Sequence, residues 1–542
     1  MEAIAHSSPA RAATWHDVER QTVSWAHAKA AALAVAVVLA LGFRITALAT
    51  YGLSEDELNK VHAIEAYRAG HFSANAEHPM LMKLAMWASV DLVDGWNRAA
   101  PDHTIPIETA LRLPNALAGA ATTVVLFGVA DLLFGGAAAA AVSLIWAFDV
   151  NAIAVNRIGK EDTFLLLFFL LAVFCYERAK RLGAGDHRAA QRWYGFSGAS
   201  FGLMLASKYM PHYLGIYALF NTLTDRNPGS NKPNRLRHYG SMIAAFLAAN
   251  AAVLLPATWR YCASYVHGAM LTHHGYLYAG QLYVTNIPIS PLGVPATYYL
   301  RLLGTRAPLA ILAAAVPGAI EMVRRRHERG FVLLRVLVVF LLVPYSLMAA
   351  KFMRYALPMF ATLDLIAAVG LASGIQWLLR KQWLRRVTRV AVSSLALAVF
   401  AAALVASEQS AAPFYSIARN EIGARLASAS EVFPEQTYDY GVREAVARIA
   451  TSAASSAVVV SDAPAVVEYY LAAFGRPDVR ARSLSGAGIP SDCRDTWVIV
   501  QDEHATFENR DLVRQLRARE EPILQFRAGE ALAAQVFRLA GR

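Results

Sequence analysis

Two short segments, YGLSEDE at residues 51–57 and EHPMLMK at residues 77–83, carry the most informative charges of this chain. The first of them comes directly after the first long apolar segment, so the adjacent carboxylates of Asp56 and Glu57 are expected at a membrane surface. Carboxylates are costly to bring near hydrocarbon unless something uses them. The same residues also fit a structural interpretation, because Ser54 followed three residues later by Glu57 forms a capping box before a helix. Both interpretations stay open at this point.

The composition indicates a membrane protein. Of 542 residues, 56% are hydrophobic and only 17% are charged, and many windows of about twenty residues carry no charge. The net charge of +11 fits basic cytoplasmic loops, and no basic-aromatic patch supports nucleic-acid binding. The three cysteines, Cys175, Cys262 and Cys493, are too widely spaced to predict a metal site or a disulfide framework.

Charge placement decides which apolar segments cross the membrane. Segment 80–96 is short and interrupted, and if it lies along the interface, every basic loop falls on one side, as the positive-inside rule prefers. Residues 1–27 are then a cytoplasmic tail, and residues 28–409 form a transmembrane domain with outward-facing loops at 51–108, 155–162 and 258–306. The eleven predicted spans are 28–50, 109–133, 136–154, 162–177, 195–207, 208–223, 239–257, 307–323, 331–350, 355–379 and 388–408.

The character of the chain changes after residue 409. Residues 410–542 alternate short apolar runs such as SAVVVSD and DTWVIVQDE with helical patterns such as VREAVARIA and ENRDLVRQLRARE. This alternation predicts a small soluble α/β domain outside the cytoplasmic membrane. No Gly-rich loop follows a strand, so a nucleotide site is not supported.

Polar residues gather on three loops that face the same side. The first loop has Asp56, Glu57, His62, Glu77, His78 and Lys83; the second has Arg157, Lys160, Glu161 and Asp162; the third has His267, His273, His274, Tyr276, Tyr278, Gln281 and Tyr283. Such a gathering predicts a site at the membrane interface. The second loop could also be a solvated turn, and the third could hold interfacial aromatic residues. Adjacent histidines alone are a weak metal signal.

The order of these motifs resembles the GT-C glycosyltransferases. EHPMLMKL at 77–84 resembles the HPPLGKLL segment of the dolichyl-phosphate-mannose protein mannosyltransferases and of the related lipid A aminoarabinose transferases, with Met80 where the second proline usually stands. The stretches at 201–215 and 354–372 resemble two further helices of these families. The likeness covers roughly residues 28–380. It implies a mainly α-helical polytopic membrane protein, GT-C-like, with about eleven transmembrane helices and a C-terminal soluble α/β domain.

The resemblance implies transfer of a sugar from a polyprenyl-phosphate lipid to a protein, lipid or glycan acceptor, with inversion, on the outer face of a bacterial-type cytoplasmic membrane. Asp56 would be the base, and Glu57 would help to place the acceptor or the base. Cations would meet the donor phosphate; the candidates are Lys83, Arg157, Lys208 and Arg354, with Lys351 also available. Candidate substrate-binding residues are His78, His273, His274 and Tyr276. Relatives differ over a divalent metal, which Asp56 could share with Glu161 or Asp162.

Two other classes of protein remain as alternatives. A membrane transporter or flippase also has many helices, but transporters usually carry charge at mid-membrane and show repeated halves, whereas the charges here lie mostly at helix ends. A membrane receptor with an external sensor domain would account for residues 410–542 but not for three polar loops on one side.

Overall fold

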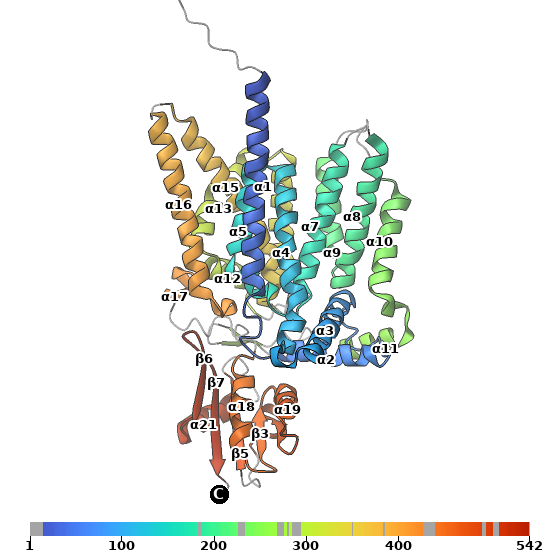
Figure 1. Ribbon diagram of the computed structural model, residues 1–542, viewed down its shortest axis with the longest axis vertical. Helices are drawn as coiled ribbons and strands as arrows, with labels where there is room; N and C mark the ends of the chain where they lie inside the picture. The colour runs from blue at the N-terminus through green and yellow to red at the C-terminus, as the bar shows by residue number, and fades with distance from the viewer. Residues whose placement is uncertain are drawn as a thin grey trace, which may run out of the picture.

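The computed structural model describes residues 15–182, 186–225, 233–267, 276–278, 281–283, 294–348, 351–382, 385–426, 439–489, 495–501 and 509–540. Most of the chain is a bundle of long helices that run side by side, with a small domain below it (Figure 1). The bundle helices are α1 (Trp15–Ile45), α4 (Ile107–Leu133), α5 (Gly136–Phe148), α6 (Val150–Asn156), α7 (Asp162–Arg181), α8 (His187–Ser207), α9 (His212–Thr224), α10 (Arg235–Ala249), α12 (Tyr298–Arg306), α13 (Leu309–Arg324), α14 (Arg329–Leu347), α15 (Leu357–Arg380) and α16 (Arg386–Ala411).

Each of the eleven predicted spans overlaps helices of this bundle, because an apolar segment in lipid must satisfy its backbone hydrogen bonds internally. The span predicted at 239–257 runs beyond α10, which ends at Ala249. Five of the described helices are long and apolar enough to cross a membrane, or up to seven if each bent pair is one span. The span predicted at 136–154 is bent by 61° between α5 and α6, where Asp149 caps α6. The count of eleven crossings stays a prediction.

The two ends of the bundle differ in what they carry. The C-terminal domain lies against one end, here called the domain end, together with the short helices α2 (Glu55–Arg68), α3 (Leu81–Ala99) and α11 (Pro256–Tyr265) (Figure 1). The last turn of α7, with Arg178, Lys180 and Arg181, and the first residue of α16, Arg386, lie at the opposite end. Helix α3, which contains the ambiguous segment 80–96, is not among the spanning candidates. The first two polar loops, at 51–108 and 155–162, therefore share one end of the bundle, whereas most of the third lies outside the described residues.

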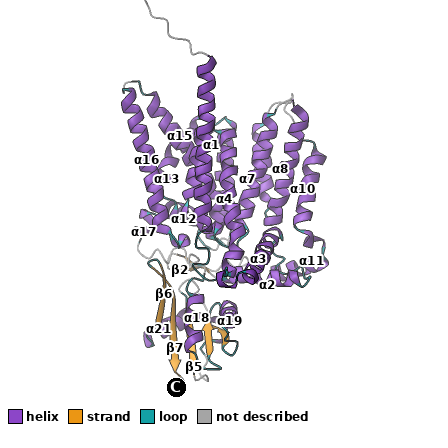
Figure 2. Cartoon of the chain, in the orientation of Figure 1, coloured by secondary structure: helices purple, strands orange, loops and turns teal. Residues whose placement is uncertain are grey.

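The C-terminal domain contains α17 (Glu421–Arg425), α18 (Val442–Ser452), β3 (Val458–Ser461), α19 (Pro464–Ala473), β4 (Arg480–Ser483), α20 (Leu484–Ala487), β5 (Asp495–Val500), α21 (Arg510–Arg519), β6 (Leu524–Ala528) and β7 (Ala531–Ala540). Its five-stranded sheet has the order β4-β3-β5-β7-β6. Strands β4, β3 and β5 are parallel, whereas β7 and β6 pair antiparallel at one edge (Figure 2). The remaining described strands, β1 (Tyr276–Tyr278) and β2 (Gln281–Tyr283), form a hairpin before α12. The predicted α/β domain is confirmed.

The C-terminal domain and the short helices share one apolar core. Leu53, Leu58 and Met86 from the domain end of the bundle belong to the same buried cluster as Val446 and Tyr470 of the domain. Because burial of apolar surface is the main driving force for packing, this shared core fixes the domain against the loop that leads into α2. The C-terminal domain therefore lies directly beside the segment that carries Asp56.

Candidate active site

Helix α2 begins with the predicted capping box. The Ser54 hydroxyl accepts a hydrogen bond from the Glu57 backbone N–H at 3.3 Å, and the Glu57 carboxylate accepts one from the Ser54 N–H at 3.0 Å. This box settles the role of Ser54 and Glu57 at the helix start. It leaves the neighbouring Asp56 side chain, 44% exposed, free to face the rest of the site.

Two cations from distant parts of the chain face Asp56. The Lys160 ammonium, in the loop before α7, forms an ion pair with the Asp56 carboxylate, and the Arg354 guanidinium lies 4.0 Å from it. Burial by itself would raise the pKa of Asp56, but Lys160 and Arg354 outweigh that effect and hold the pKa below its usual range. Asp56 is therefore ionised at neutral pH and can accept a proton.

Arg354 connects Asp56 to a second carboxylate. Its guanidinium is also 4.0 Å from Asp162, at the first residue of α7, and Asp162 accepts a hydrogen bond of 2.7 Å from Lys208. The Lys208 ammonium lies over the Tyr355 ring, 4.2 Å from its centre. Lys208 and Arg354, both predicted to bind donor phosphate, thus lie in one cluster with Asp56.

A further ion pair borders this cluster on the side of α2. Lys60, one helical turn after Asp56, is 2.9 Å from Glu161, and His78 is 3.7 Å from the same carboxylate. Burial lowers the pKa of His78 well below its ordinary value, more than Glu161 raises it, so the imidazole is neutral. His78 therefore lies beside the predicted site as a neutral hydrogen-bonding group.

Of the two tasks predicted for Glu57, placing the acceptor or placing the base, its contacts favour the second. Arg112 of α4 donates to both of its carboxylate oxygens at 2.7 Å, and the Gly159 N–H donates to it at 2.9 Å. Glu57 is buried, with 1% of its surface exposed. It holds the start of α2 against α4 and the 157–161 loop, and it has no surface left for an acceptor.

Two of the predicted phosphate-binding cations are also used elsewhere. The Arg157 guanidinium donates to the carbonyls of Phe43, Thr46 and Ala47 at 2.6–2.9 Å, which ties the end of α1 to the α6–α7 connection. Lys83 donates to the carbonyls of Asn75 and His78 at 2.6 and 2.9 Å. Burial lowers the pKa of Lys83 to about 7. Both side chains shape the loops around the site and do not face Asp56.

The third predicted loop lies largely beyond what the structure describes. His273 and His274 are outside the described residues, and Tyr276 is described only through its backbone in β1. Within the described ranges, no group of three His, Cys, Asp or Glu side chains is arranged to hold a metal ion. Asp56, Glu161 and Asp162 each face a lysine or arginine, so these residues do not fit a shared divalent cation. The predicted metal stays untested.

Sequence reasoning missed the roles of Lys60, Lys160 and Arg112. Lys60 could have been found, because residues four apart on a helix share a face and Lys60 follows Asp56 by four. The partners of Lys160 and Arg112 had no sequence signal, because each lies more than fifty residues away from its carboxylate. The cluster therefore combines the ionised Asp56 carboxylate with the cations of Lys160, Arg354 and Lys208 at a membrane surface. Such a set of charges suits displacement of an anionic leaving group.

The chain is similar to known proteins in part of its sequence and in its fold. Residues 106–254 match the family model for dolichyl-phosphate-mannose-protein mannosyltransferase. The fold is similar to crystal structures of ArnT from Cupriavidus metallidurans. The apo state has a TM-score of 0.52 at 13% identity, covering 96% of this chain and 98% of that one. The form bound to undecaprenyl phosphate has a TM-score of 0.51 at 12% identity, covering 95% and 98%. No curated protein sequence matches the chain significantly.

The chain therefore has the GT-C fold. The family match lies within the helical bundle, from just before α4 to the residues after α10, and the fold match extends over the C-terminal domain as well.

Proposed function

We propose that this enzyme transfers a sugar from a polyprenyl-phosphate lipid to an acceptor hydroxyl on the outer face of the cytoplasmic membrane, with Asp56 as the base. The observation that carries the proposal is the half-exposed Asp56 carboxylate beside Lys160 and Arg354, at the end of a membrane-embedded bundle. A donor with a hydrocarbon chain and an anionic phosphate needs cations at that boundary. The similar ArnT structure, bound to undecaprenyl phosphate, supports this class of donor.

The reaction is a single displacement at the anomeric carbon. The acceptor oxygen forms a bond to that carbon while the bond to the phosphate oxygen breaks, and the polyprenyl phosphate leaves with the electron pair. The hydroxyl proton goes to Asp56. Lys160, Arg354 and Lys208 stabilise the charge that develops on the leaving phosphate. One carboxylate acting on one displacement inverts the anomeric centre.

Donor binding would also prepare the base. In the structure, Lys160 and Arg354 hold the pKa of Asp56 low, which makes Asp56 a weak base. When the donor phosphate shares these two cations, their pull on Asp56 weakens and its pKa rises toward a value better matched to proton transfer. The base would therefore become stronger once the donor is in place.

The direct test uses membranes that contain the full-length protein and a polyprenyl-phosphate donor labelled in the sugar. The wild type should move label from the lipid to an acceptor fraction, and Asp56→Asn should not. An intact labelled lipid that only changes its side of the membrane would identify a flippase and overturn the proposal.

The face of the membrane is tested separately with single cysteines in a variant that lacks the native three. Thr451→Cys lies on the exposed end of α18, and Arg385→Cys lies exposed at the opposite end of the bundle. An impermeant thiol reagent added to intact cells should label the first and not the second. The reverse pattern would place the active face in the cytoplasm.

A further inference from the structure

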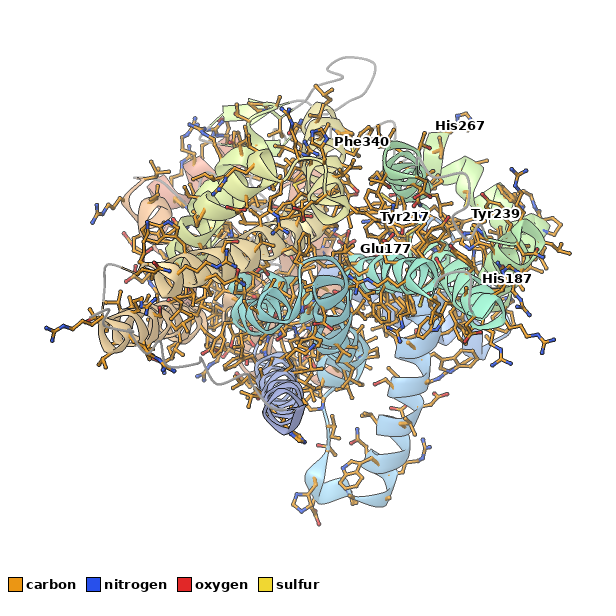
Figure 3. All side chains as sticks on the ribbon, turned by 90° about the horizontal axis from the view of Figure 1, so that it is seen from above. Glu177, His187, Tyr217, Tyr239, His267 and Phe340 are labelled. Carbon is orange, nitrogen blue, oxygen red and sulfur yellow. The ribbon has the colours of Figure 1, made fainter. Side chains whose placement is uncertain are left out.

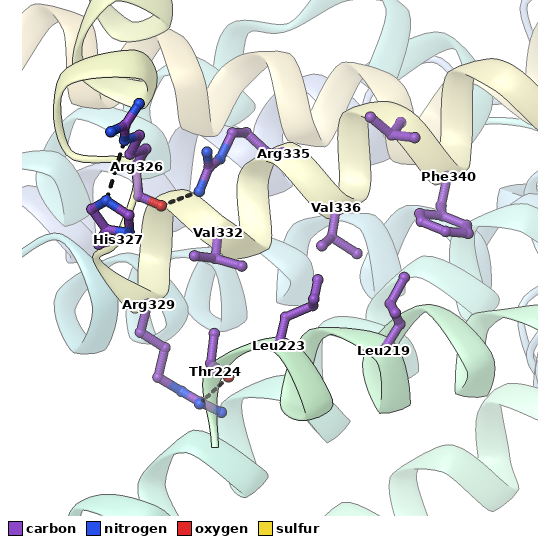
Figure 4. Close-up of a pocket in the computed structure, with 11 residues that line it drawn as sticks. Leu219, Leu223, Thr224, Arg326, His327, Arg329, Val332, Arg335, Val336 and Phe340 are labelled. Carbon is purple, nitrogen blue, oxygen red and sulfur yellow. Dashed lines mark hydrogen bonds between the residues drawn. The ribbon is translucent and has the colours of Figure 1, made fainter. Parts of the chain in front are cut away.

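A groove of about 560 Å³ lies between α9 and α14, at the end of the bundle opposite the C-terminal domain (Figure 4). Its size is within the usual range of ligand pockets, about 300–1,000 Å³. The reaction proposed above does not use it. Its lining residues are Leu219, Leu223, Thr224, Arg326, His327, Arg329, Val332, Arg335, Val336, Val339 and Phe340.

The part of the groove away from the end of the bundle is apolar, and its side chains are exposed on the outside of the bundle. Leu223 on α9 is 50% exposed, and Val339 and Phe340 on α14 are 51% and 36% exposed. Along the helices of a membrane bundle such side chains contact hydrocarbon, not water. This part of the groove therefore suits an acyl chain.

One wall of the groove is held by a partly buried polar network. Arg329 donates to Glu177 of α7 at 2.6 and 2.7 Å and to Asp225, just after α9, at 2.9 Å. The Tyr217 hydroxyl donates to Glu177 at 2.5 Å, and the two residues lie between neighbouring helices in the view from above (Figure 3). The charge of Arg329 is therefore compensated, and Arg329 serves to hold α7, α9 and α14 together.

The rim of the groove carries two guanidinium groups with neutral partners. Arg335 donates to the backbone carbonyls of Arg326 and Phe331, and the Arg326 Nε donates to the His327 ring at 3.2 Å (Figure 4). Within the described part of the chain, neither Arg326 nor Arg335 has a carboxylate within ion-pair distance. The rim thus presents positive charge at the level where the apolar lining ends.

We propose that this groove binds an anionic glycerophospholipid, with an acyl chain against α9 and α14 and the phosphate at Arg326 and Arg335. Charge complementarity selects the lipid class, because a guanidinium donates well-matched hydrogen bonds to phosphate oxygens and basic residues at a membrane surface attract anionic lipids. The headgroup of a zwitterionic lipid carries a positive charge of its own, which Arg326 and Arg335 would repel. The bound lipid bridges α9 and α14 and stabilises that side of the bundle.

The test uses full-length protein purified in a neutral detergent, with phosphatidylglycerol or phosphatidylcholine of identical acyl chains as the probe. Phosphatidylglycerol should raise the melting temperature in a saturable way and remain bound in native mass spectra, and phosphatidylcholine should do neither. The double variant R326Q/R335Q should bind phosphatidylglycerol roughly 30-fold more weakly, from about a factor of five for each cation. Leu223→Trp, which fills the apolar part, should also reduce lipid retention.

The matched control is R385Q/R386Q, which removes two exposed arginines at the same end of the bundle but away from the groove. It should bind phosphatidylglycerol like the wild type. Equal stabilisation by both lipids, or undiminished phosphatidylglycerol binding in R326Q/R335Q, would overturn the proposal. An equal loss in the control would show general charge attraction to the membrane surface, and it would overturn the proposal as well. If R326Q/R335Q fails to fold, Leu223→Trp decides: unchanged lipid retention there would refute the site.

Discussion

Arg112 of α4 donates hydrogen bonds of 2.7 Å to both carboxylate oxygens of Glu57. Its other N–H groups donate to the carbonyls of Leu48, Tyr51 and Gly52 at 2.6–3.0 Å. This pair fixes the loop that leads from α1 into α2. It therefore sets the position of Asp56 without contacting a substrate, so that two adjacent carboxylates have separate tasks.

Glu57→Gln should destabilise the protein. The change leaves the Arg112 guanidinium buried without its counter-charge, which typically costs about 3–5 kcal/mol. A clearly lower melting temperature in detergent is the expected result, with Glu55→Gln, an exposed neighbour, melting like the wild type. If Glu57→Gln melted like that control yet lost transfer as fully as Asp56→Asn, Glu57 would have a chemical role after all.

Asp56→Asn should lower the rate of transfer by roughly a hundredfold or more, because the variant keeps the shape of the side chain but cannot take the acceptor proton. Its melting temperature should fall less than that of Glu57→Gln, since the Asp56 side chain is half-exposed, although the buried Lys160 loses a partner. Transfer is measured with the labelled donor, and Glu55→Gln serves as the matched control. Near-normal transfer by Asp56→Asn would remove Asp56 as the base.

The cations divide into two groups that mutation can separate. Lys160→Gln and Arg354→Gln should each weaken donor binding roughly ten- to hundredfold, because each loses a charged contact worth about 1.5–3 kcal/mol. Arg157→Gln should leave donor affinity nearly unchanged and lower the melting temperature, because Arg157 binds the carbonyls at the end of α1. Titration with polyprenyl phosphate measures the affinity. A donor-binding defect in Arg157→Gln alone would restore the assignment predicted from the sequence.

The pH profile should report the pairing of Lys160 with Asp56. Lys160 and Arg354 keep the pKa of Asp56 below its usual range, so kcat/KM of the wild type should show no acidic limb from this residue above about pH 4. Lys160→Gln removes one cation while the burial remains, so the pKa of Asp56 rises and the acidic limb moves to higher pH. Arg157→Gln should keep the wild-type profile. An unchanged profile in Lys160→Gln would show that the pH dependence of kcat/KM does not report the pKa of Asp56.

The contact between the C-terminal domain and the α2 loop should support transfer. The Tyr470 hydroxyl donates to Glu108 at 2.8 Å and accepts from the Leu53 N–H at 2.6 Å. Tyr470→Phe leaves both buried partners short of a hydrogen bond, a loss of about 1–3 kcal/mol. Faster proteolysis of the domain and a severalfold drop in transfer are expected. Tyr469→Phe is the control, since no hydrogen bond of its hydroxyl occurs among the described residues. Equal behaviour of the two variants would contradict this link.

The helices, the strands and the set of connections that share one end of the bundle could be predicted from the sequence. Uncharged apolar runs must form helices in lipid, and the basic loops between them predicted which connections share an end of the bundle. The alternation of SAVVVSD and DTWVIVQDE with helical patterns predicted β3, β5 and the helices between them. Asp56 could be identified as a candidate base only through the resemblance of the surrounding motifs to the GT-C glycosyltransferases.

Only the tertiary structure decided which charges meet. Neighbours on a helix point about 100° apart, so Asp56 and Glu57 face different surroundings, and the sequence does not say which one is buried. Glu57 meets Arg112 55 residues away, and Asp56 meets Lys160 and Arg354 from other helices' ends. The task of a charged side chain depends on the partner that desolvates or compensates it, and packing between distant segments supplies that partner.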